Sequence, residues 1–370
     1  MSQLGVLLLV SQSTGRYALG GAAAGALAIA NAIGSPIAGS LADRHGQRTV
    51  VLVQSLAGAA GLTATVLLAD TATHAIMAAA VTGFLLPQVG PLARVRWQPI
   101  TADATDQRNL VNAAFSYEGA ADEASFVLGP ALIGVLAMVL DPGGALLAGA
   151  VLLTVFGSWF AVHPTSKLVS GHERDTTEHL SWWTSAFAVL VVAQFAIGMF
   201  FGSIQTGTAS LAESAGVPGS AGLIHAVLGI GSVTAGLAMA ALPEKIRYAT
   251  RMLIAAVVMF VLSTPLLLVD SIPALVACVA VLGFAVAPYM ISNFALAGVI
   301  VPVTHVGTAM TLLAGSTSLG YASGAAIAGR LVDLDGHHAA FLVTVSVTAC
   351  AVIVSAACQG LLKRAPVVNG

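Results

Sequence analysis

The chain has 370 residues, of which 57% are hydrophobic and only 8% are Asp, Glu, Lys or Arg, and its formal net charge is −2. So few charged side chains cannot cover the surface of a soluble domain of this length, so the composition indicates a polytopic membrane protein. No segment carries a basic cluster of the kind that binds nucleic acid. The 39 glycines favour closely packed helices, and the ten-residue alternation of a membrane β-barrel is missing from the sequence.

Apolar runs long enough to cross about 30 Å of hydrocarbon as helices predict eleven membrane spans. They lie at 18–41, 50–69, 75–97, 110–140, 145–162, 183–211, 221–242, 252–269, 273–300, 306–332 and 339–362. Before them stands the apolar piece "LGVLLLV", residues 4–10, which is too short to span. We expect it to be the end of a truncated first helix and not a signal peptide, because no basic segment precedes it. The complete protein would then have twelve helices.

The distribution of Lys and Arg predicts the orientation of these helices. Twelve of the 14 basic residues fall on the side that holds the loops near 43–48, 94–108, 163–182 and 243–251 and the C-terminus. Arg16 and Arg330 fall on the other side. The positive-inside rule places the side with twelve in the cytoplasm. We therefore expect a multi-pass protein of the cell membrane with a cytoplasmic C-terminus.

The longest polar connection, "HPTSKLVSGHERDTTEHLSWW" at 163–183, divides the chain into two halves of six helices when the short first piece is counted. We expect an N-terminal helical bundle at 1–163, a central cytoplasmic linker at 164–182 and a C-terminal helical bundle at 183–370. Two such halves are typical of secondary transporters.

The segment "GSLADRHGQR", residues 39–48, joins the second and third helices on the predicted cytoplasmic side. Gly39 permits close contact between helices and Gly46 permits a tight turn. Asp43 can cap a helix or meet cations on a neighbouring helix as a breakable latch.

This segment resembles the signature loop of the major facilitator superfamily, although Gln47 stands in place of a basic residue. The residues that match are Gly39, Leu41, Ala42, Asp43, Arg44, Gly46 and Arg48. The resemblance implies an all-α fold of two six-helix bundles, here with an incomplete first helix. It also implies that a gating loop of Gly39, Asp43, Arg44, Gly46 and Arg48 sets the balance between inward-open and outward-open states.

A second resemblance lies in "SFVLGPALIG", residues 125–134, which is similar to the Gly-Pro motif of antiporters in the same superfamily. Gly129, Pro130 and Gly134 match, whereas Ser125 and Ile133 stand where the motif has glycines. Pro130 removes one backbone donor and is expected to bend its helix beside Gly129. The resemblance implies an exporter. The arginine that many members carry in the fourth helix is replaced by Leu86.

Three acids, Glu118, Asp122 and Glu123, lie in the predicted span 110–140. Glu118 and Asp122 share one helix face, while Glu123 points about 100° further round. Each charged carboxylate at membrane depth costs about 2.5–3.5 kcal/mol, so each must be neutralised. Three explanations stay open: an ion pair with Arg94 or Arg96, proton carriage, or binding of a cationic substrate. The first two are compatible.

Polar residues elsewhere in the spans have an ordinary interpretation as interhelical hydrogen-bonding groups. The resemblance implies that the first, fourth, seventh and tenth helices line a central cavity, which makes Gln88, Gln194, Tyr289 and Asn293 candidates for the substrate cavity. Motifs of hydrolases, metalloproteases and nucleotide-binding proteins are missing. We therefore expect no enzyme activity, no cofactor and no metal site.

These observations predict a secondary active transporter that moves a small organic molecule by alternating access. Proton-coupled efflux is the first expectation and proton-coupled uptake the second. A non-transporting membrane protein, such as an embedded enzyme or a sensor, is the third. The expected partners are a small-molecule substrate, protons and the lipid bilayer, with no nucleic acid and with the chain as a monomer.

Overall fold

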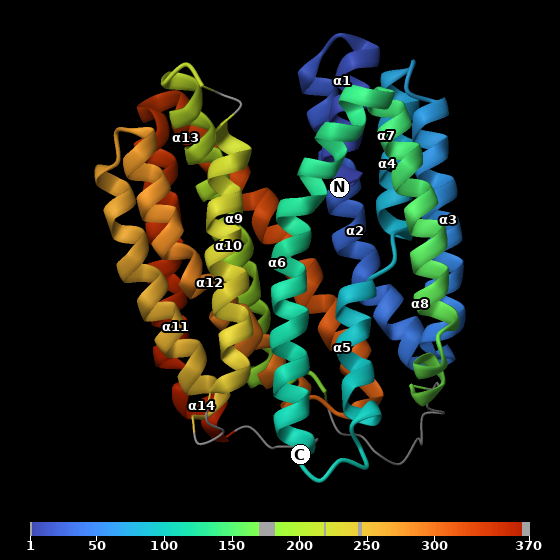
Figure 1. Ribbon diagram of the computed structural model, residues 1–370, viewed down its shortest axis with the longest axis vertical. Coiled ribbons are helices and arrows are strands. Elements are labelled where there is room, and N and C mark those ends of the chain that lie inside the picture. The colour runs from blue at the N-terminus through green and yellow to red at the C-terminus, as the bar shows by residue number, and fades with distance from the viewer. Residues whose placement is uncertain (1, 170–181, 218–219, 243–245, 365–370) are drawn as a thin grey trace. The chain divides into compact units, whose positions relative to one another are not determined.

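The structure is a computed structural model that describes residues 2–169, 182–217, 220–242 and 246–364. These residues form helices joined by short turns (Figure 1). In this part of the chain nine helical segments are long and apolar enough to cross a membrane: Leu19–His45, Gln47–Leu67, Ala72–Ile100, Pro142–Val162, Ser185–Ser214, Ala221–Ala241, Tyr248–Leu268, Ile272–Ile300 and Leu334–Ala357. The predicted all-α, polytopic class is confirmed.

The first part of the chain follows the predicted spans to within a few residues, with one break. Its helices are α1 (Ser2–Thr14), α2 (Tyr17–His45), α3 (Gln47–Leu67), α4 (Ala72–Leu85), α5 (Val89–Ile100), α6 (Gln107–Leu140), α7 (Pro142–Leu152), the π-helix η1 (Leu153–Gly157), α8 (Ser158–Val162) and the 3-10 helix η2 (Pro164–Leu168). The predicted span 75–97 is divided between α4 and α5. Leu86 is extended (φ −63°, ψ 130°) because the ring of the next residue, Pro87, disfavours the helical conformation before it.

The second part contains α9 (Ser185–Ser214), α10 (Ala221–Ala238), η4 (Met239–Ala241), α11 (Tyr248–Ser263), η5 (Thr264–Leu268), α12 (Ile272–Ile300), η6 (Val303–His305), α13 (Val306–Ala357) and α14 (Gln359–Arg364). The run called α13 is two helices, because Asp335 (φ −142°, ψ 25°) and Gly336 (φ 61°, ψ −153°) leave the helical region. Positive φ at Gly336 costs little without a Cβ atom. The two helices correspond to the predicted spans 306–332 and 339–362.

Two compact units divide the chain. Unit 1 contains the described residues of Met1–Ile100, Leu128–His179 and Thr304–Ser318, and unit 2 those of Thr101–Val127, Leu180–Val303 and Leu319–Gly370. Each unit therefore draws on both halves of the sequence, and the units cut across the predicted boundaries at 163 and 183. The two-bundle division stays a prediction, and most of the predicted linker 164–182 lies outside the described residues.

The core of unit 1 gathers apolar side chains from α1, α2, α3, α4 and α7, including Val6, Leu27, Leu62 and Leu146. Glycines bring the backbones together. A Cβ atom on Gly83 of α4 would lie 2.1 Å from the carbonyl oxygen of Leu27 on α2. Close backbone approach of this kind is how helices associate in lipid, where little hydrophobic force acts between them.

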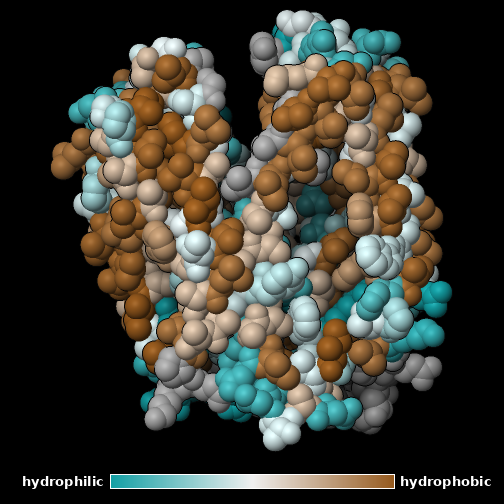
Figure 2. Space-filling view, in the orientation of Figure 1, coloured by the Kyte–Doolittle hydropathy of each residue, from teal (hydrophilic) through white to brown (hydrophobic). Residues whose placement is uncertain are grey.

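Unit 2 is built in the same way, with α10 and α11 packed on α12. A Cβ atom on Gly283 of α12 would lie 2.3 Å from the carbonyl oxygen of Leu228 on α10. In both units large apolar side chains such as Val53, Val151 and Ile254 are more than half exposed. Hydrophobic residues cover the visible faces of α3, α7 and α11, and hydrophilic ones gather toward helix ends (Figure 2). Faces of this kind suit contact with lipid.

Candidate functional site

Asp43, at the end of α2, binds the N-terminus of α13 within unit 1. Its Oδ1 accepts a hydrogen bond from the backbone N–H of Gly307 (3.0 Å). Its Oδ2 accepts bonds from the N–H (2.7 Å) and the hydroxyl (2.7 Å) of Thr308. The first N–H groups of a helix have no partner within the helix and carry partial positive charge, so they form a site for an anion. Asp43 therefore acts as a carboxylate cap on a helix that begins more than 260 residues later.

Glycines allow this contact to form. A Cβ atom on Gly39 would lie 2.1 Å from Oγ1 of Thr311 and 2.6 Å from the carbonyl oxygen of Gly307. A Cβ atom on Gly307 would lie 2.3 Å from Oδ1 of Asp43. Gly46 has φ 80° and separates α2 from α3, so the turn also requires glycine. The two predicted roles of glycine in this loop, close approach and a tight turn, thus correspond to particular contacts.

The arginines of this segment are exposed, whereas those of α5 are buried. Arg44 and Arg48 are exposed, whereas Arg94 and Arg96 on α5 are each 3% exposed. Arg96 donates from Nε to Oε1 of Gln47 (2.8 Å) and from Nη1 to the carbonyl oxygen of Phe160 (2.9 Å).

Arg96 and Gln47 make further contacts with neighbouring residues. Nη1 of Arg96 donates to the hydroxyl of Thr165 (3.1 Å), and its guanidinium carbon lies 3.6 Å from the centroid of the Phe160 ring. Gln47 is 1% exposed and donates from Nε2 to the carbonyl oxygen of Leu92 (3.1 Å). The partners that these bonds give Arg96 are neutral. The predicted ion pair of Arg94 or Arg96 with an acid of α6 stays a prediction.

The three acids of α6 lie in unit 2 and differ in burial. Glu118 and Asp122 are partly exposed, while Glu123 is 2% exposed. The hydroxyl of Ser232 on α10 lies beside the Glu123 carboxyl group. Among the described residues, neither Oε1 of Glu123 nor Oγ of Ser232 has a hydrogen-bond partner.

Close helix packing surrounds this carboxyl group. A Cβ atom on Gly119 of α6 would lie 2.4 Å from the side chain of Ile291 on α12. Phe126 of α6 stacks on Phe201 of α9 with ring centroids 5.9 Å apart. Further along, α6 stays helical across Gly129 and Pro130. Gly129 is buried, and the side chain of Pro130 lies outside the described residues. The predicted bend stays a prediction.

Three of the four candidate cavity residues form one buried polar cluster in unit 2. Asn293 of α12 donates from Nδ2 to Oε1 of Gln194 (2.9 Å) and to the carbonyl oxygen of Leu190 (3.1 Å), both on α9. The Tyr289 hydroxyl is 3.5 Å from the carbonyl oxygen of Ala193. Gln194, Tyr289 and Asn293 are each 0% exposed. Gln88 lies in unit 1, at the break between α4 and α5.

Gln194 and Asn293 each have one buried polar atom without a hydrogen-bond partner among the described residues. Nε2 of Gln194 and Oδ1 of Asn293 are buried and have no hydrogen-bond partner in the described part of the chain. The Gln194 nitrogen is a donor and the Asn293 oxygen is an acceptor.

Several of these residues carry no motif in the sequence. Gly307 and Thr308 lie in the first turn of α13, but nothing in the sequence links them to Asp43. Ser232 lies in an apolar span without a motif. Gln47, which departs from the superfamily motif, is a buried hydrogen-bonding partner of Arg96.

Comparison with known proteins places this geometry in a family. A sequence profile described as Major Facilitator Superfamily matches residues 2–248 and 190–367. The chain belongs to the major facilitator superfamily. The predicted fold and family resemblance are therefore confirmed, and the chain is a multi-pass membrane transporter of this superfamily. Among curated proteins, none is significantly similar to the chain.

Solved structures show the same fold. The human organic anion transporter MFSD10 (TETRAN) is 17% identical, with 96% of this chain and 89% of that chain covered and a TM-score of 0.69. A bacterial homologue of the iron transporter ferroportin in an outward-facing state is 12% identical, with 96% of this chain and 98% of that chain covered and a TM-score of 0.72. The same homologue with soaked iron is 13% identical, with a TM-score of 0.69. At these identities the likeness concerns the fold alone.

Proposed function

We propose that this chain exports a small organic molecule across the cell membrane in exchange for protons, as a monomer with a cytoplasmic C-terminus. The superfamily supports transport by alternating access between states that open to opposite sides. The direction of transport, the coupling to protons and the location in the cell membrane are parts of this proposal. The observation that carries the proposal is the burial of the Glu123 carboxyl group on α6.

Glu123 has the properties that proton coupling requires. A charged carboxylate in hydrocarbon is costly unless it is paired, and a bound proton removes that cost. The carboxyl group is 2% exposed and its Oε1 has no hydrogen-bond partner among the described residues. When alternating access brings water to such a group, the group can release its proton. Asp122 directly before it and Glu118 five residues before it are further carboxylates of the same helix.

The Asp43 cap supports a cycle between two conformations. Three of its hydrogen bonds run to the first turn of one helix. Such a contact is specific and can also break when water replaces the N–H donors. We propose that the gating loop around Asp43 holds one conformation of the cycle by this contact.

The buried cluster of Gln194, Tyr289 and Asn293 is our candidate for substrate recognition, and Gln88 in unit 1 stays a separate candidate. The unused donor on Gln194 and the unused acceptor on Asn293 support this role, because buried polar atoms without partners are costly and a polar ligand would satisfy them. The cluster favours an organic substrate that carries both a hydrogen-bond acceptor and a donor.

Whole-cell accumulation of a panel of fluorescent organic cations and anions tests this function. Cells that express the chain should accumulate less of at least one compound than cells with an empty vector, and a proton uncoupler should abolish the difference. Raised, uncoupler-sensitive accumulation would instead support uptake by symport. A panel without any difference in either direction would contradict the proposed export of these compounds.

Variants of α6 test the role of the acids. Glu123→Gln should abolish uncoupler-sensitive export while leaving the protein in the membrane at its normal level. Glu213→Gln removes an exposed carboxylate near the end of α9 and should transport normally. A Glu118→Gln, Asp122→Asn double variant shows whether the partly exposed acids take part. Unchanged export by Glu123→Gln would remove the basis of the coupling proposal.

A further inference from the structure

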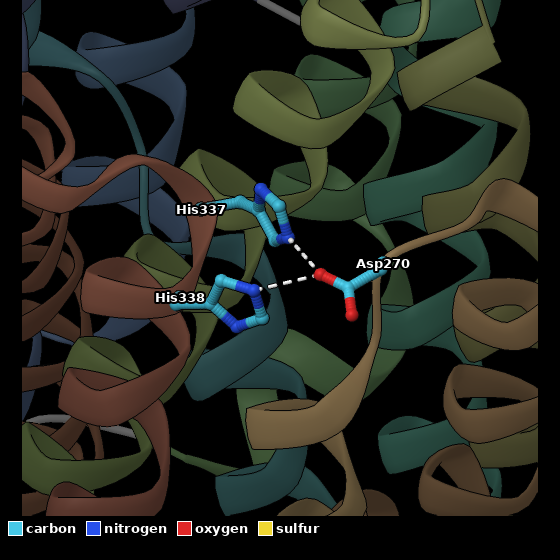
Figure 3. A group of neighbouring side chains, drawn as sticks. All are labelled: Asp270, His337 and His338. Carbon is cyan, nitrogen blue, oxygen red and sulfur yellow. Dashed lines mark hydrogen bonds and ion pairs between the residues drawn. The ribbon is translucent and has the colours of Figure 1, made fainter.

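Three side chains from separate parts of unit 2 converge at one end of its helices, away from the groups discussed above. Nε2 of His338 lies 2.8 Å and Nε2 of His337 lies 3.7 Å from Oδ1 of Asp270. Both imidazole rings turn a nitrogen toward the same carboxylate oxygen (Figure 3). The ring centroids are 4.2 Å apart.

The local backbone explains this convergence. Asp270 follows the 3-10 helix η5 and precedes Ser271, the N-cap of α12. His337 and His338 come directly after the kink at Asp335 and Gly336, where the second helix of α13 begins. Nε2 of His337 also lies 3.0 Å from the carbonyl oxygen of Val269, which holds the ring against the η5–α12 connection.

We infer that Asp270, His337 and His338 form a binding site for a divalent transition metal of the zinc class. Two imidazole nitrogens and one carboxylate oxygen are ligands that Zn²⁺ prefers, and water completes such a three-ligand set. The three ligand atoms all lie within 4.8 Å of one another. Ligands about 2.05 Å from a tetrahedral ion lie about 3.3 Å apart, so small side-chain rotations would bring these atoms to that spacing.

Exposure supports the assignment. The Asp270 side chain is 77% exposed, His338 38% and His337 16%. An ion can therefore enter from solvent, and water can occupy the remaining position. Carbonyl and carboxylate oxygens accept only from a protonated imidazole nitrogen, so an ion would displace a proton from each Nε2 and would replace the contact between His337 and the carbonyl oxygen of Val269.

The bound ion would join the α11–α12 connection to the second helix of α13. No metal site was expected from the sequence, because known metal-binding motifs are missing, and Asp270 lies 67 and 68 positions before the two histidines. On the predicted topology this end of the helices lies on the non-cytoplasmic side, so the metal would come from outside the cell. The site is separate from Glu123 and from the Gln194–Asn293 cluster, and its role would be to stabilise unit 2.

The test uses the full chain, purified in detergent with any polyhistidine tag removed and stripped of metal with a chelator. Calorimetric titration with Zn²⁺ should give one site per chain, and Co²⁺ should give the visible absorption of a tetrahedral complex. Zn²⁺ should also raise the thermal unfolding temperature, because a ligand of the native state stabilises it. A His337→Ala, His338→Ala variant should bind at least about tenfold more weakly.

Two further variants separate a metal site from a simple hydrogen-bonding contact. Asp270→Asn keeps an oxygen that accepts a bond from His338 but is a poorer metal ligand, so it should lose Zn²⁺ binding while the unfolding temperature of the metal-free protein changes little. His74→Ala removes an exposed histidine of α4 and should bind normally. The inference is overturned by absence of stoichiometric Zn²⁺ binding, or by equal affinity in the wild type, the double histidine variant and Asp270→Asn.

Discussion

Asp43 and Thr308 are joined by two hydrogen bonds of 2.7 Å, one from the backbone N–H and one from the hydroxyl, across 265 positions of sequence. Both bonds end on the same carboxylate oxygen, and the other oxygen binds the N–H of Gly307. The signature loop is therefore held by the first turn of a distant helix, and the consequences of weakening each bond can be measured.

Asp43→Asn should weaken this cap more than Thr308→Val does. The Asn amide retains one acceptor oxygen, but its NH₂ group faces N–H donors and the negative charge is lost. We expect a loss of about 2 kcal/mol for Asp43→Asn and about 1 kcal/mol for Thr308→Val. Chemical unfolding of the purified protein in detergent measures both. Asp70→Asn, at an exposed acid that follows α3, is the matched control and should change stability little.

Gly39→Ala should separate α2 from the start of α13. The added methyl group would lie 2.1 Å from Oγ1 of Thr311 and 2.6 Å from a backbone oxygen, and the backbone cannot move aside without displacing the helix. Transport and unfolding temperature should both fall. Gly21→Ala on the same helix has nothing within 4 Å of the new Cβ atom and should be neutral or slightly stabilising. Equal behaviour of the two variants would argue against the close approach.

Gln47→Lys restores a basic residue to the superfamily motif and should destabilise this chain. Its ammonium group would meet the buried guanidinium of Arg96, whose Nε lies 2.8 Å from Oε1 of Gln47. An uncompensated buried charge costs about 3 kcal/mol or more. Unfolding in detergent should show this loss, and adding Arg96→Gln should recover part of it. Thr49→Lys places the same charge at an exposed position of α3 and should have little effect.

Asn293→Ala should destabilise unit 2 and impair transport together. The change removes the bonds to Leu190 and Gln194 and leaves buried polar atoms without partners, at a cost of about 1–3 kcal/mol. Asn293→Asp retains the size and one acceptor oxygen but removes both N–H donors. If the cluster binds substrate, KM should rise in the variants that still fold. Thermal unfolding and concentration-dependent transport separate the two effects.

The fold was predictable because hydrocarbon imposes strong rules on sequence. Eleven apolar runs correspond to helices whose ends differ from the predicted ones by a few residues. The division between α4 and α5 was missed although Pro87 signals it, because apolar residues continue on both sides of the proline.

The site was less predictable because its contacts join distant segments. The motif identified Asp43, but its partners lie more than 260 residues away with no periodic pattern between them. Helical spacing showed that Glu123 points away from Glu118 and Asp122, yet spacing alone does not say which face is buried. Asp270 meets two histidines that directly follow a kink at Asp335 and Gly336, and no sequence pattern connects the two segments.

Proton flux in proteoliposomes tests the central claim most directly. Purified protein is reconstituted with a pH-sensitive dye inside the vesicles, and a substrate found by the accumulation screen is added outside. We predict proton movement opposite to substrate movement in the wild type and in Glu213→Gln, and its loss in Glu123→Gln, which should still exchange labelled for unlabelled substrate. Substrate-driven proton flux at the wild-type rate in Glu123→Gln would contradict the account.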